Sequence, residues 1–260
     1  MKKMYVAAAV AAFCSLATGC MSSAQSDETK EKEVRIMSYN IRNGKGMDEV
    51  TNLERTAQVI LKNNPDILAL QEIDSVTNRS KRVDVLKELA QKVSMNHVYA
   101  PAIEFDGGKY GIGMLSKEKP LGSRYLSLPG REEKRAFLIV EFEDYVYCCT
   151  HLSLTPEDQL LSLPVIKEAL SGVKKPLFIA GDLNAHPDSE LIGGLKKEFK
   201  LISPLDVYTY PAEGANETLD YIGVQLKDTA VVSVVSSEVV NEPLASDHRP
   251  VISVVKLAVD

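Results

Sequence analysis

The sequence predicts an α/β fold in which parallel and antiparallel strands share the same sheets. Of the 260 residues, 45% are hydrophobic and 25% are charged, which is enough for one large domain with a full core. From residue 34 onward, short runs rich in valine, isoleucine and leucine alternate with amphipathic segments of helical spacing. Several strand-like runs also follow one another with no helix between them, which indicates antiparallel hairpins.

The first 20 residues have the layout of a bacterial export signal. Lys2 and Lys3 precede an apolar run at 5–16, and small residues lead directly into Cys20. This ending resembles a lipobox, in which the cysteine receives a lipid and becomes the first residue of the mature protein. Ordinary cleavage further along the chain is the alternative, and the apolar run is shorter than the roughly 20 residues that span a bilayer. We therefore expect an exported lipoprotein, periplasmic or at the cell surface, that is held at a membrane through Cys20.

Residues 21–33 are polar and have no apolar period, so we expect a flexible tether between the lipid and a catalytic domain at 34–260. Cys14 would leave with the signal. Cys148 and Cys149 are adjacent in a strand-like run, and neighbouring cysteines rarely bond to each other because the geometry is strained. No structural disulfide is expected.

The first part of the domain predicts alternating strands and helices. Strands are expected at 34–41 and 66–73, and helices at 48–63 and 81–93, with Pro65 separating the first helix from the second strand. Five strand-like runs follow without helices between them, and hairpins are expected among them. They lie at 98–102, 111–116, 122–128, 136–142 and 145–151.

The second part returns to helices. Segments 156–170 and 189–197 have helical character and flank a short buried strand at 177–181. Four further strands are expected around Tyr208, Tyr221, Val232 and Val254.

Ionisable and amide side chains recur at or just beyond the ends of these strands. α/β proteins commonly place their chemistry there. Each residue alone has an ordinary explanation, such as a turn, a helix cap or a salt bridge. Their joint occurrence favours a single functional site. The residues are Asn40, Glu72, His151, Asp182, Asn184, Asp220, Asp247 and His248.

Oxygen donors dominate this set, which indicates the kind of metal. No Cys-Cys or His-x-x-x-His spacing occurs in it, so a hard cation such as Mg²⁺ or Mn²⁺ suits the set better than zinc. The sequence also contains no Gly-x-x-x-x-Gly-Lys-Ser/Thr phosphate loop and no Gly-x-Ser-x-Gly elbow. The nucleotide-loop and serine-hydrolase classes are thereby excluded.

Seven motifs contain these residues or lie between them. In chain order they are Ser-Tyr-Asn-Ile-Arg, Gln-Glu-Ile-Asp, Tyr-Gly-Ile-Gly-Met-Leu-Ser, Thr-His-Leu, Gly-Asp-Leu-Asn-Ala-His-Pro, Leu-Asp-Tyr-Ile and Ser-Asp-His-Arg-Pro-Val. Together they resemble the endonuclease/exonuclease/phosphatase superfamily, which includes deoxyribonuclease I, abasic-site endonucleases, neutral sphingomyelinases and inositol-polyphosphate 5-phosphatases. The resemblance covers 34–260. It implies a four-layer sandwich of two packed mixed β-sheets flanked by helices, with the active site at one end.

The resemblance also assigns a metal site. It implies that Glu72 is the main metal ligand, with Asn40 and Asp247 beside the ion. Asp182 and Asn184 would orient the attacking water and hold a phosphate oxygen. These roles fit an in-line attack of water on phosphorus, in which a cation and positioned donors stabilise the developing charge.

Two histidines complete the implied machinery. His248, paired with Asp220, would act as general base or would stabilise phosphate charge. His151 would donate a hydrogen bond to a phosphate oxygen. Tyr110 is interpreted either as a cleft residue or as a residue of the core or rim.

Two segments depart from the family pattern. Gly-Ile-Gly-Met carries glycine where family members often have asparagine or alanine, and the loop 131–135 is charged. Arg131 and Arg135 in this loop either clamp a second phosphate or belong to a solvated surface. Both departures are candidates for substrate selectivity.

The acidic balance of the chain bears on the substrate. The formal net charge is −6, whereas proteins that hold long nucleic acids usually present a basic face. A small or lipid-derived phosphodiester is therefore the first expectation and a secreted nuclease the second, since a basic stretch at 79–82 leaves a local groove open. A non-catalytic binding protein on the same fold is a third hypothesis, disfavoured because Glu72, Asp182 and His248 are all present. We expect a monomer.

Overall fold

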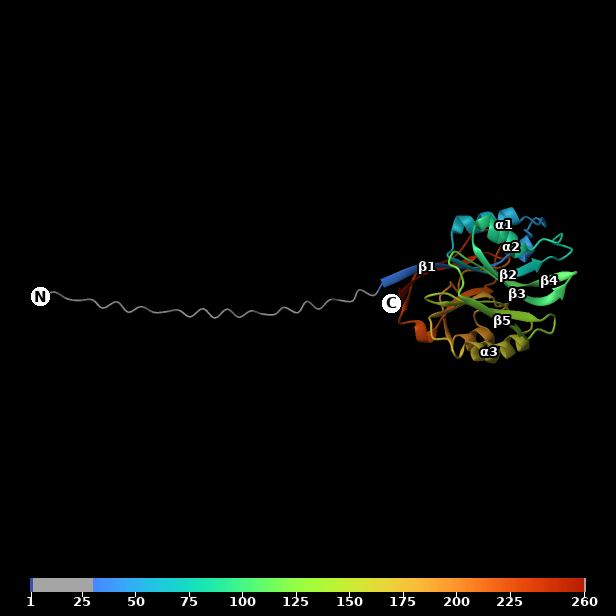
Figure 1. Cartoon of the computed structure of the whole chain (residues 1–260). Helices are drawn as coiled ribbons and strands as arrows, with labels where there is room; N and C mark the ends of the chain where they lie inside the picture. Colours follow the sequence, from blue (N-terminus) through green and yellow to red (C-terminus); the bar gives the residue numbers. More distant parts are fainter. Residues whose placement is uncertain (2–29, 260) are drawn as a thin grey trace.

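Two six-stranded sheets pack face to face, with helices on the outer surface of each (Figure 1). The structure is a computed structural model that describes Met1 and residues 30–259. The predicted signal, including Cys20, and the predicted tether up to residue 29 lie outside the described residues. The four layers are those that the family resemblance implied.

The first sheet combines strands from both ends of the domain. Its strands are β1 (Lys30–Asn40), β2 (Ile67–Ser75), β3 (Asn96–Phe105), β4 (Gly108–Ser116), β11 (Val232–Val239) and β12 (Val251–Val259). They are arranged in the order β11-β12-β1-β2-β4-β3. Only β1 and β2 run parallel, and the chain crosses between them through a helix, as parallel neighbours require.

The second sheet repeats this plan. Its strands are β5 (Gly122–Leu128), β6 (Arg135–Glu141), β7 (Val146–His151), β8 (Leu177–Asp182), β9 (Phe199–Leu201) and β10 (Asp220–Gln225). They are arranged in the order β5-β6-β7-β8-β10-β9. The central pair β7 and β8 is parallel and the other pairs are antiparallel, so both sheets are mixed as predicted.

Helices cover the outer face of each sheet. The helices are α1 (Leu53–Asn63), α2 (Val85–Val93), α3 (Pro156–Leu170) and α4 (Glu190–Leu195), with short 3₁₀ turns η1 (Arg42–Gly44) and η2 (Leu226–Asp228). The labels of Figure 1 place α1 and α2 on one side of the sandwich and α3 on the other. Within the described part of the chain, no helix has both the length and the apolar character needed to cross a bilayer.

The helix starts are set by side-chain caps. Asn52 accepts a hydrogen bond from the backbone of α1, Asp84 does the same for α2, and Ser189 for α4. Such a cap satisfies one of the free N–H groups of the first turn. The predicted helices 48–63 and 81–93 therefore begin later than expected, at the residues that follow these caps.

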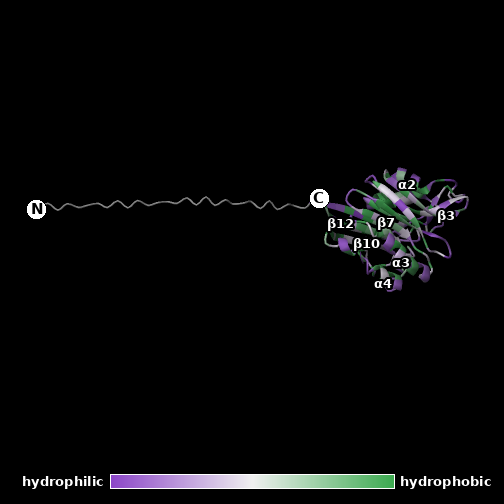
Figure 2. Ribbon diagram, turned by 60° about the horizontal axis from the view of Figure 1, so that its bottom comes forward, coloured by the Kyte–Doolittle hydropathy of each residue, from purple (hydrophilic) through white to green (hydrophobic). Residues whose placement is uncertain are grey.

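The central strands are buried on both faces, because each sheet packs against its partner on one side and helices on the other. Ile36 lies in the core between the sheets, and its neighbour Met37 lies in the core beneath α1 and α2. A third apolar cluster joins the second sheet to α3 and α4. Burial on both faces explains why the sequences of these strands are continuous apolar runs and not alternating apolar and polar residues. In Figure 2 the strands in the middle of the domain, around the label β7, are accordingly greener than the helices and loops at its edge.

Two predictions need correction. β1 begins at Lys30, inside the segment 21–33 that was predicted to be a tether, because its first residues pair with β12. The strand expected around Tyr208 is wrong, since this half-exposed residue lies in a loop between strands. The unpredicted strand β9 pairs with β10 instead. The other predicted strands and helices are confirmed, with shifts at their ends.

The strand directions bring the predicted site together at one end of the sandwich. β1 starts at Lys30 and ends at Asn40, and its 11 residues place these two ends about 33 Å apart at about 3.3 Å per residue. The parallel strands β7 and β8 end in the same register, with His151 opposite Asp182. The carboxyl ends of the parallel strands of both sheets thus meet, as α/β proteins commonly arrange their sites.

Candidate active site

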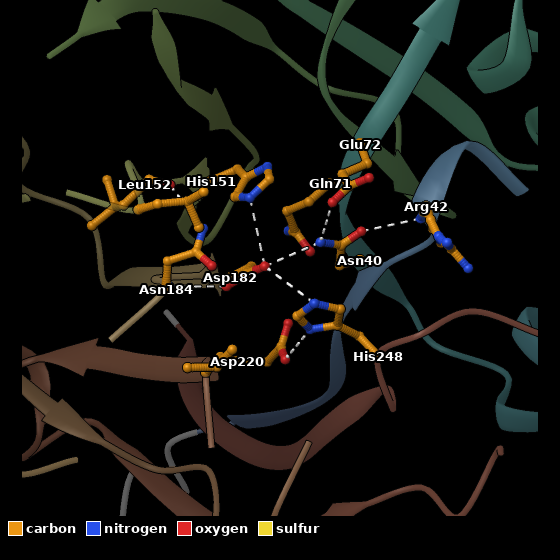
Figure 3. A network of polar contacts seen from close by, with 12 residues as sticks. Asn40, Arg42, Gln71, Glu72, His151, Leu152, Asp182, Asn184, Asp220 and His248 are labelled. Atoms are coloured by element: carbon orange, nitrogen blue, oxygen red, sulfur yellow. Dashed lines mark hydrogen bonds and ion pairs between the residues drawn. The ribbon is translucent and has the colours of Figure 1, made fainter. Parts of the chain in front are cut away.

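Asp182 is the centre of a polar network that joins the two sheets (Figure 3). Its Oδ2 accepts a hydrogen bond from Asn40 Nδ2 at 3.0 Å and lies 3.6 Å from the Nε2 atoms of both His151 and His248. Its Oδ1 accepts a hydrogen bond from the backbone N–H of Asn184 at 2.9 Å. Asp182 is 1% exposed, so these interactions are formed in a medium of low dielectric constant.

A glycine allows Asp182 to come so close to β7. Gly181 has φ 155°, and a Cβ atom at this position would lie 2.0 Å from the carbonyl oxygen of Thr150. Any larger residue would push β8 away from β7. The glycine of the Gly-Asp-Leu-Asn motif therefore serves the geometry of the site, because it keeps His151 and Asp182 in register.

Glu72 is presented by an irregularity in β2. The pairing of β2 with β4 shifts between Leu70 and Ile73, and Glu72 has a left-handed backbone with φ 60°. This is a β-bulge, a feature that re-aims a side chain and is common beside active sites. A left-handed non-glycine residue costs about 1 kcal/mol or more, and the surrounding fold must hold it in place.

Asn40 connects Glu72 to Asp182. Its Nδ2 donates to Glu72 Oε1 at 3.0 Å as well as to Asp182, while its Oδ1 accepts a hydrogen bond from the backbone N–H of Arg42 at 3.1 Å. Asn40 is fully buried. In this arrangement its amide nitrogen, and not its carbonyl oxygen, faces the two carboxylates.

The carboxylates around Glu72 fit a divalent cation. Burial raises the pKa of Glu72, and the nearby Asp247 and Asp182 raise it further, against the hydrogen bond from Asn40. The carboxylate of Asp247 lies 3.5 Å from Arg42 Nε. Partly buried carboxylate oxygens that carry like charges are the ligand set that Mg²⁺ and Mn²⁺ prefer.

A second group of possible ligand atoms lies beside the first. Asp182, Asp220 and His248 offer atoms within 4.8 Å of one another. His248 Nδ1, however, is 2.8 Å from Asp220 Oδ2 and is therefore already hydrogen-bonded. This group is better described as a carboxylate–imidazole pair next to Asp182 than as a metal centre.

His248 is held in its charged form. Burial opposes the imidazolium, but Asp220 and Asp182 outweigh it and raise the pKa of His248 to about 10. Asp220 lies opposite Asp182 on the neighbouring strand and is fully buried. The ring of Tyr210 packs on the imidazole with its centroid at 4.8 Å.

His151, in contrast, is held in its neutral form. Burial lowers its pKa to about 4, because the nearby Asp182 only partly offsets the burial and Arg135 opposes a positive ring. At neutral pH the two histidines beside Asp182 therefore differ, one imidazolium and one neutral imidazole. Such a separation of pKa values is typical of functional sites.

The network opens into a pocket of about 500 Å³. Six of the predicted residues line the pocket. Asn40 and Asp220 lie behind them and hydrogen-bond to the lining residues Glu72 and His248, respectively. Tyr110 lines the pocket too and is also nearly buried, so it is a cleft residue at the edge of the core. The lining residues among those predicted are Glu72, His151, Asp182, Asn184, Asp247 and His248.

The rest of the wall was not predicted from the sequence. Two of its residues, His186 and Leu219, lie within motifs but had no assigned role, and the others come from the charged segment 131–135 and from loops without a motif. The residues are Glu132, Glu133, Leu154, His186, Tyr210, Glu217 and Leu219. Arg131 does not take part, because its guanidinium pairs with Asp158 and the residue does not line the pocket. The hypothesis of a phosphate clamp is therefore wrong for Arg131.

Comparison with known proteins decides the family. The sequence model of the Endonuclease/Exonuclease/phosphatase family matches residues 37–248, a span that contains all the predicted site residues. The chain belongs to this family. Members of the family hydrolyse phosphoester bonds, so the protein is a hydrolase that acts on ester bonds. No curated protein sequence matches it significantly.

Solved structures of the endonuclease/exonuclease/phosphatase family share the fold. A protein of this family from Bacteroides vulgatus has a TM-score of 0.72 at 19% identity, with 87% of this chain and 99% of that chain covered. The human Nocturnin catalytic domain with bound sulfate has a TM-score of 0.64 at 20% identity, covering 86% and 93%. A mannosyl-6-phosphatase from Bacteroides thetaiotaomicron has a TM-score of 0.65 at 15% identity, covering 85% and 98%.

Proposed function

We propose that this enzyme hydrolyses a small or lipid-derived phosphodiester with the help of Mg²⁺ or Mn²⁺. The observation that carries the proposal is the cluster of partly buried carboxylates around Glu72, beside one charged and one neutral histidine. The cluster provides a cation site, and the histidines provide two different donors to a phosphate.

Glu72 and Asp247 would hold the cation, with Asn40 fixing Glu72 from behind. When bound, the cation neutralises phosphate charge and polarises the phosphorus–oxygen bonds. His248 keeps its proton at neutral pH, which favours a role as stabiliser of phosphate charge over a role as general base. Asp182 Oδ2 lies 3.6 Å from the Nε2 atoms of both histidines, and we assign Asp182 and Asn184 to the orientation of the attacking water.

The charge of the pocket favours a diester over a monoester. Its wall carries a single arginine, Arg135, against several carboxylates, among them Glu132, Glu133 and Glu217. A phosphodiester carries one negative charge and a phosphomonoester about two at neutral pH, so the monoester suffers more repulsion from this wall. The mannosyl-6-phosphatase with a similar fold supports a small phosphate ester but acts on a monoester, so the distinction needs a direct test.

Hydrolysis of nucleic acid is less favoured. The basic stretch at 79–82 does not line the pocket, and its Arg79 is neutralised by two hydrogen bonds to the buried carboxylate of Asp74. Arg82 donates to backbone carbonyl groups. A groove for a polyanion needs several uncompensated cations, and the pocket rim is acidic instead.

The proposed location follows from the sequence. We propose that the protein is exported, that a lipid on Cys20 anchors it to a membrane, and that it works as a monomer. Replacing Cys20 by serine, Cys20→Ser, in a bacterial host should abolish metabolic labelling with palmitate and release the protein from the membrane fraction. Labelling that persists in Cys20→Ser would overturn the anchor, and light scattering of the purified protein tests the monomer.

The experiment that tests the function compares bis-p-nitrophenyl phosphate with p-nitrophenyl phosphate. The purified chain should hydrolyse the diester faster, with Mg²⁺ or Mn²⁺ but not with EDTA. His248→Ala should lose this activity. Faster cleavage of the monoester would replace the diester by a monoester as the substrate class, and activity that is unchanged in EDTA would contradict the metal requirement.

A further inference from the structure

Arg135 lies between the pocket and two glutamates. It is 5% exposed at the start of β6 and lines the pocket beside His151. Its Nη1 lies 2.9 Å from Glu133 Oε1 and 3.4 Å from His151 Nδ1, and its Nη2 donates to Glu132 Oε1 at 3.1 Å. The two glutamates compensate the guanidinium charge. Arg135 is thus fixed in place and is not free to clamp a phosphate of the substrate.

The same glutamate also fixes the loop that follows His151. Glu132 accepts hydrogen bonds from Ser153 Oγ at 2.7 Å and from the backbone N–H of Leu154 at 2.8 Å. The chain on the far side of His151 is therefore tied to the carboxylate that holds Arg135. Glu132 therefore restrains both His151 and Arg135, and the contact between these two side chains has a fixed geometry.

A guanidinium determines which ring nitrogen of a histidine carries the proton. Arginine N–H groups only donate, and the guanidinium stays protonated in proteins. The nitrogen that faces it, Nδ1 of His151, must then present its lone pair. A neutral imidazole with a lone pair on Nδ1 carries its proton on Nε2, which is the nitrogen that lies 3.6 Å from Asp182 Oδ2.

We propose that Arg135 is a positioning residue that holds His151 as the neutral tautomer protonated at Nε2, with this N–H presented to the phosphoester. The role of His151 toward the substrate rests on the proposed function, whereas the tautomer does not. The two histidines of the site then have opposite arrangements. Asp220 makes Nδ1 of His248 a donor, and Arg135 makes Nδ1 of His151 an acceptor.

The tautomer is measured directly by NMR on the full chain. The sequence has four histidines, so a two-bond ¹H–¹⁵N spectrum of the ¹⁵N-histidine-labelled protein in Mg²⁺ buffer resolves each ring, with His151 assigned by its absence in His151→Gln. We expect a protonated Nε2 and an unprotonated Nδ1 for His151 at pH 7.5. A proton on Nδ1, or an equal mixture of tautomers, overturns the proposal whatever the activity of the enzyme.

Variants separate positioning from general support of the fold. Arg135→Ala should give a mixture of His151 tautomers. It should lower kcat by up to about tenfold with KM little changed, because a His151 Nε2–H that is no longer held in place stabilises less of the charge in the transition state. Arg135→Lys, which still donates, should recover part of both. Arg131→Ala is the matched control, because Arg131 lies on the same loop but pairs with Asp158 away from the pocket.

The outcomes are distinguishable. A single Nε2-protonated tautomer in Arg135→Ala overturns the role of Arg135 even if kcat falls. Should Arg135→Ala fail to fold, the wild-type and Arg135→Lys spectra still decide the tautomer. If the wild-type protein hydrolyses no phosphoester, the proposed function fails, and the spectrum continues to test the contact between Arg135 and His151.

Discussion

Asp220 Oδ2 lies 2.8 Å from His248 Nδ1, and both residues are buried where β10 meets the loop before β12. The other ring nitrogen of His248 faces Asp182 at 3.6 Å. The imidazole thus has a carboxylate on either side. An imidazolium between two anions is stabilised strongly when water is excluded, which accounts for a pKa of about 10 in spite of burial.

Removing the charge of Asp220 should therefore inactivate the enzyme without removing the histidine. We expect Asp220→Asn to lower kcat for the diester by about 10²-fold or more, the range found when a donor that stabilises transition-state charge is lost. The pKa of His248, followed by NMR, should fall below about 10. Asp228→Asn is the control, since Asp228 is another buried aspartate but binds the backbone N–H of Leu177 outside the pocket. Unchanged kcat in Asp220→Asn would contradict the assigned pair.

Glu72 should couple the stability of the protein to divalent cations. The wild-type melting temperature should rise with Mg²⁺ or Mn²⁺, because a ligand that binds only the folded state stabilises it by about 2.7 kcal/mol at 100 times its Kd. Glu72→Gln should lose most of this rise, and without metal it should be as stable as the wild type, since a partly buried charge near Asp247 and Asp182 is removed. Glu54→Gln, on the exposed face of α1, should keep the full rise. An equal rise in Glu72→Gln would exclude Glu72 as the ligand.

Asn40→Asp should destabilise the metal-free protein. The change replaces an amide that donates to Glu72 and Asp182 by a third carboxylate. We expect a loss of about 2–3 kcal/mol in the free energy of unfolding, the scale of hydrogen bonds to charged groups. Divalent cations should recover part of it. Urea unfolding with EDTA and with Mg²⁺ measures both effects, and a variant as stable as wild type in EDTA would show that Asn40 does not hold the two carboxylates.

Glu132 should make the fold acid-sensitive. Burial opposes its charge, but hydrogen bonds from Ser153, from backbone N–H groups and from Arg135 outweigh this and lower its pKa from 4.5 to about 2. A lowered folded-state pKa stabilises the protein fully above the unfolded value of 4.5, and this contribution is lost as the pH falls from there through about 2.

The measurement is urea unfolding of Glu132→Gln and wild type at several pH values. The variant should be about 1–2 kcal/mol less stable at pH 7, after allowance for solvent screening of a partly exposed group, and the difference should shrink between pH 4.5 and pH 2. Glu168→Gln, an exposed glutamate on α3, provides the baseline. A difference that is independent of pH would show that the charge of Glu132 does not matter.

Much of the fold and the inner part of the site could be predicted from the sequence. Strand ends and polar residues coincide in the chain, so Asn40, Glu72, His151 and Asp182 were found from local patterns. Seven motifs in the right order made the four layers predictable. The prediction of a strand near Tyr208 was wrong because these polar and aromatic residues lie in a loop. A local sequence pattern does not show which segments pair across a sheet.

The outer wall of the pocket could not be predicted, because it is assembled by tertiary packing. Glu132 and Glu217 are far apart in the chain and belong to loops without a motif. The glycine-rich departure from the family pattern also has a structural cause. A Cβ at Gly113 would lie 2.6 Å from a methyl group of Leu86, so this glycine serves the packing of α2 on the sheet. Selectivity is better sought in the residues that line the pocket.

The course of β1 has a practical consequence. The chain enters the domain at Lys30, and β1 carries it to Asn40 at the far end, about 33 Å away. When the enzyme is coupled to beads or to a sensor chip through its amino terminus, its active-site pocket should therefore face the solution. Immobilisation through that terminus is expected to preserve turnover of dissolved esters, whereas coupling through a cysteine introduced at Leu154, on the pocket rim, should block it.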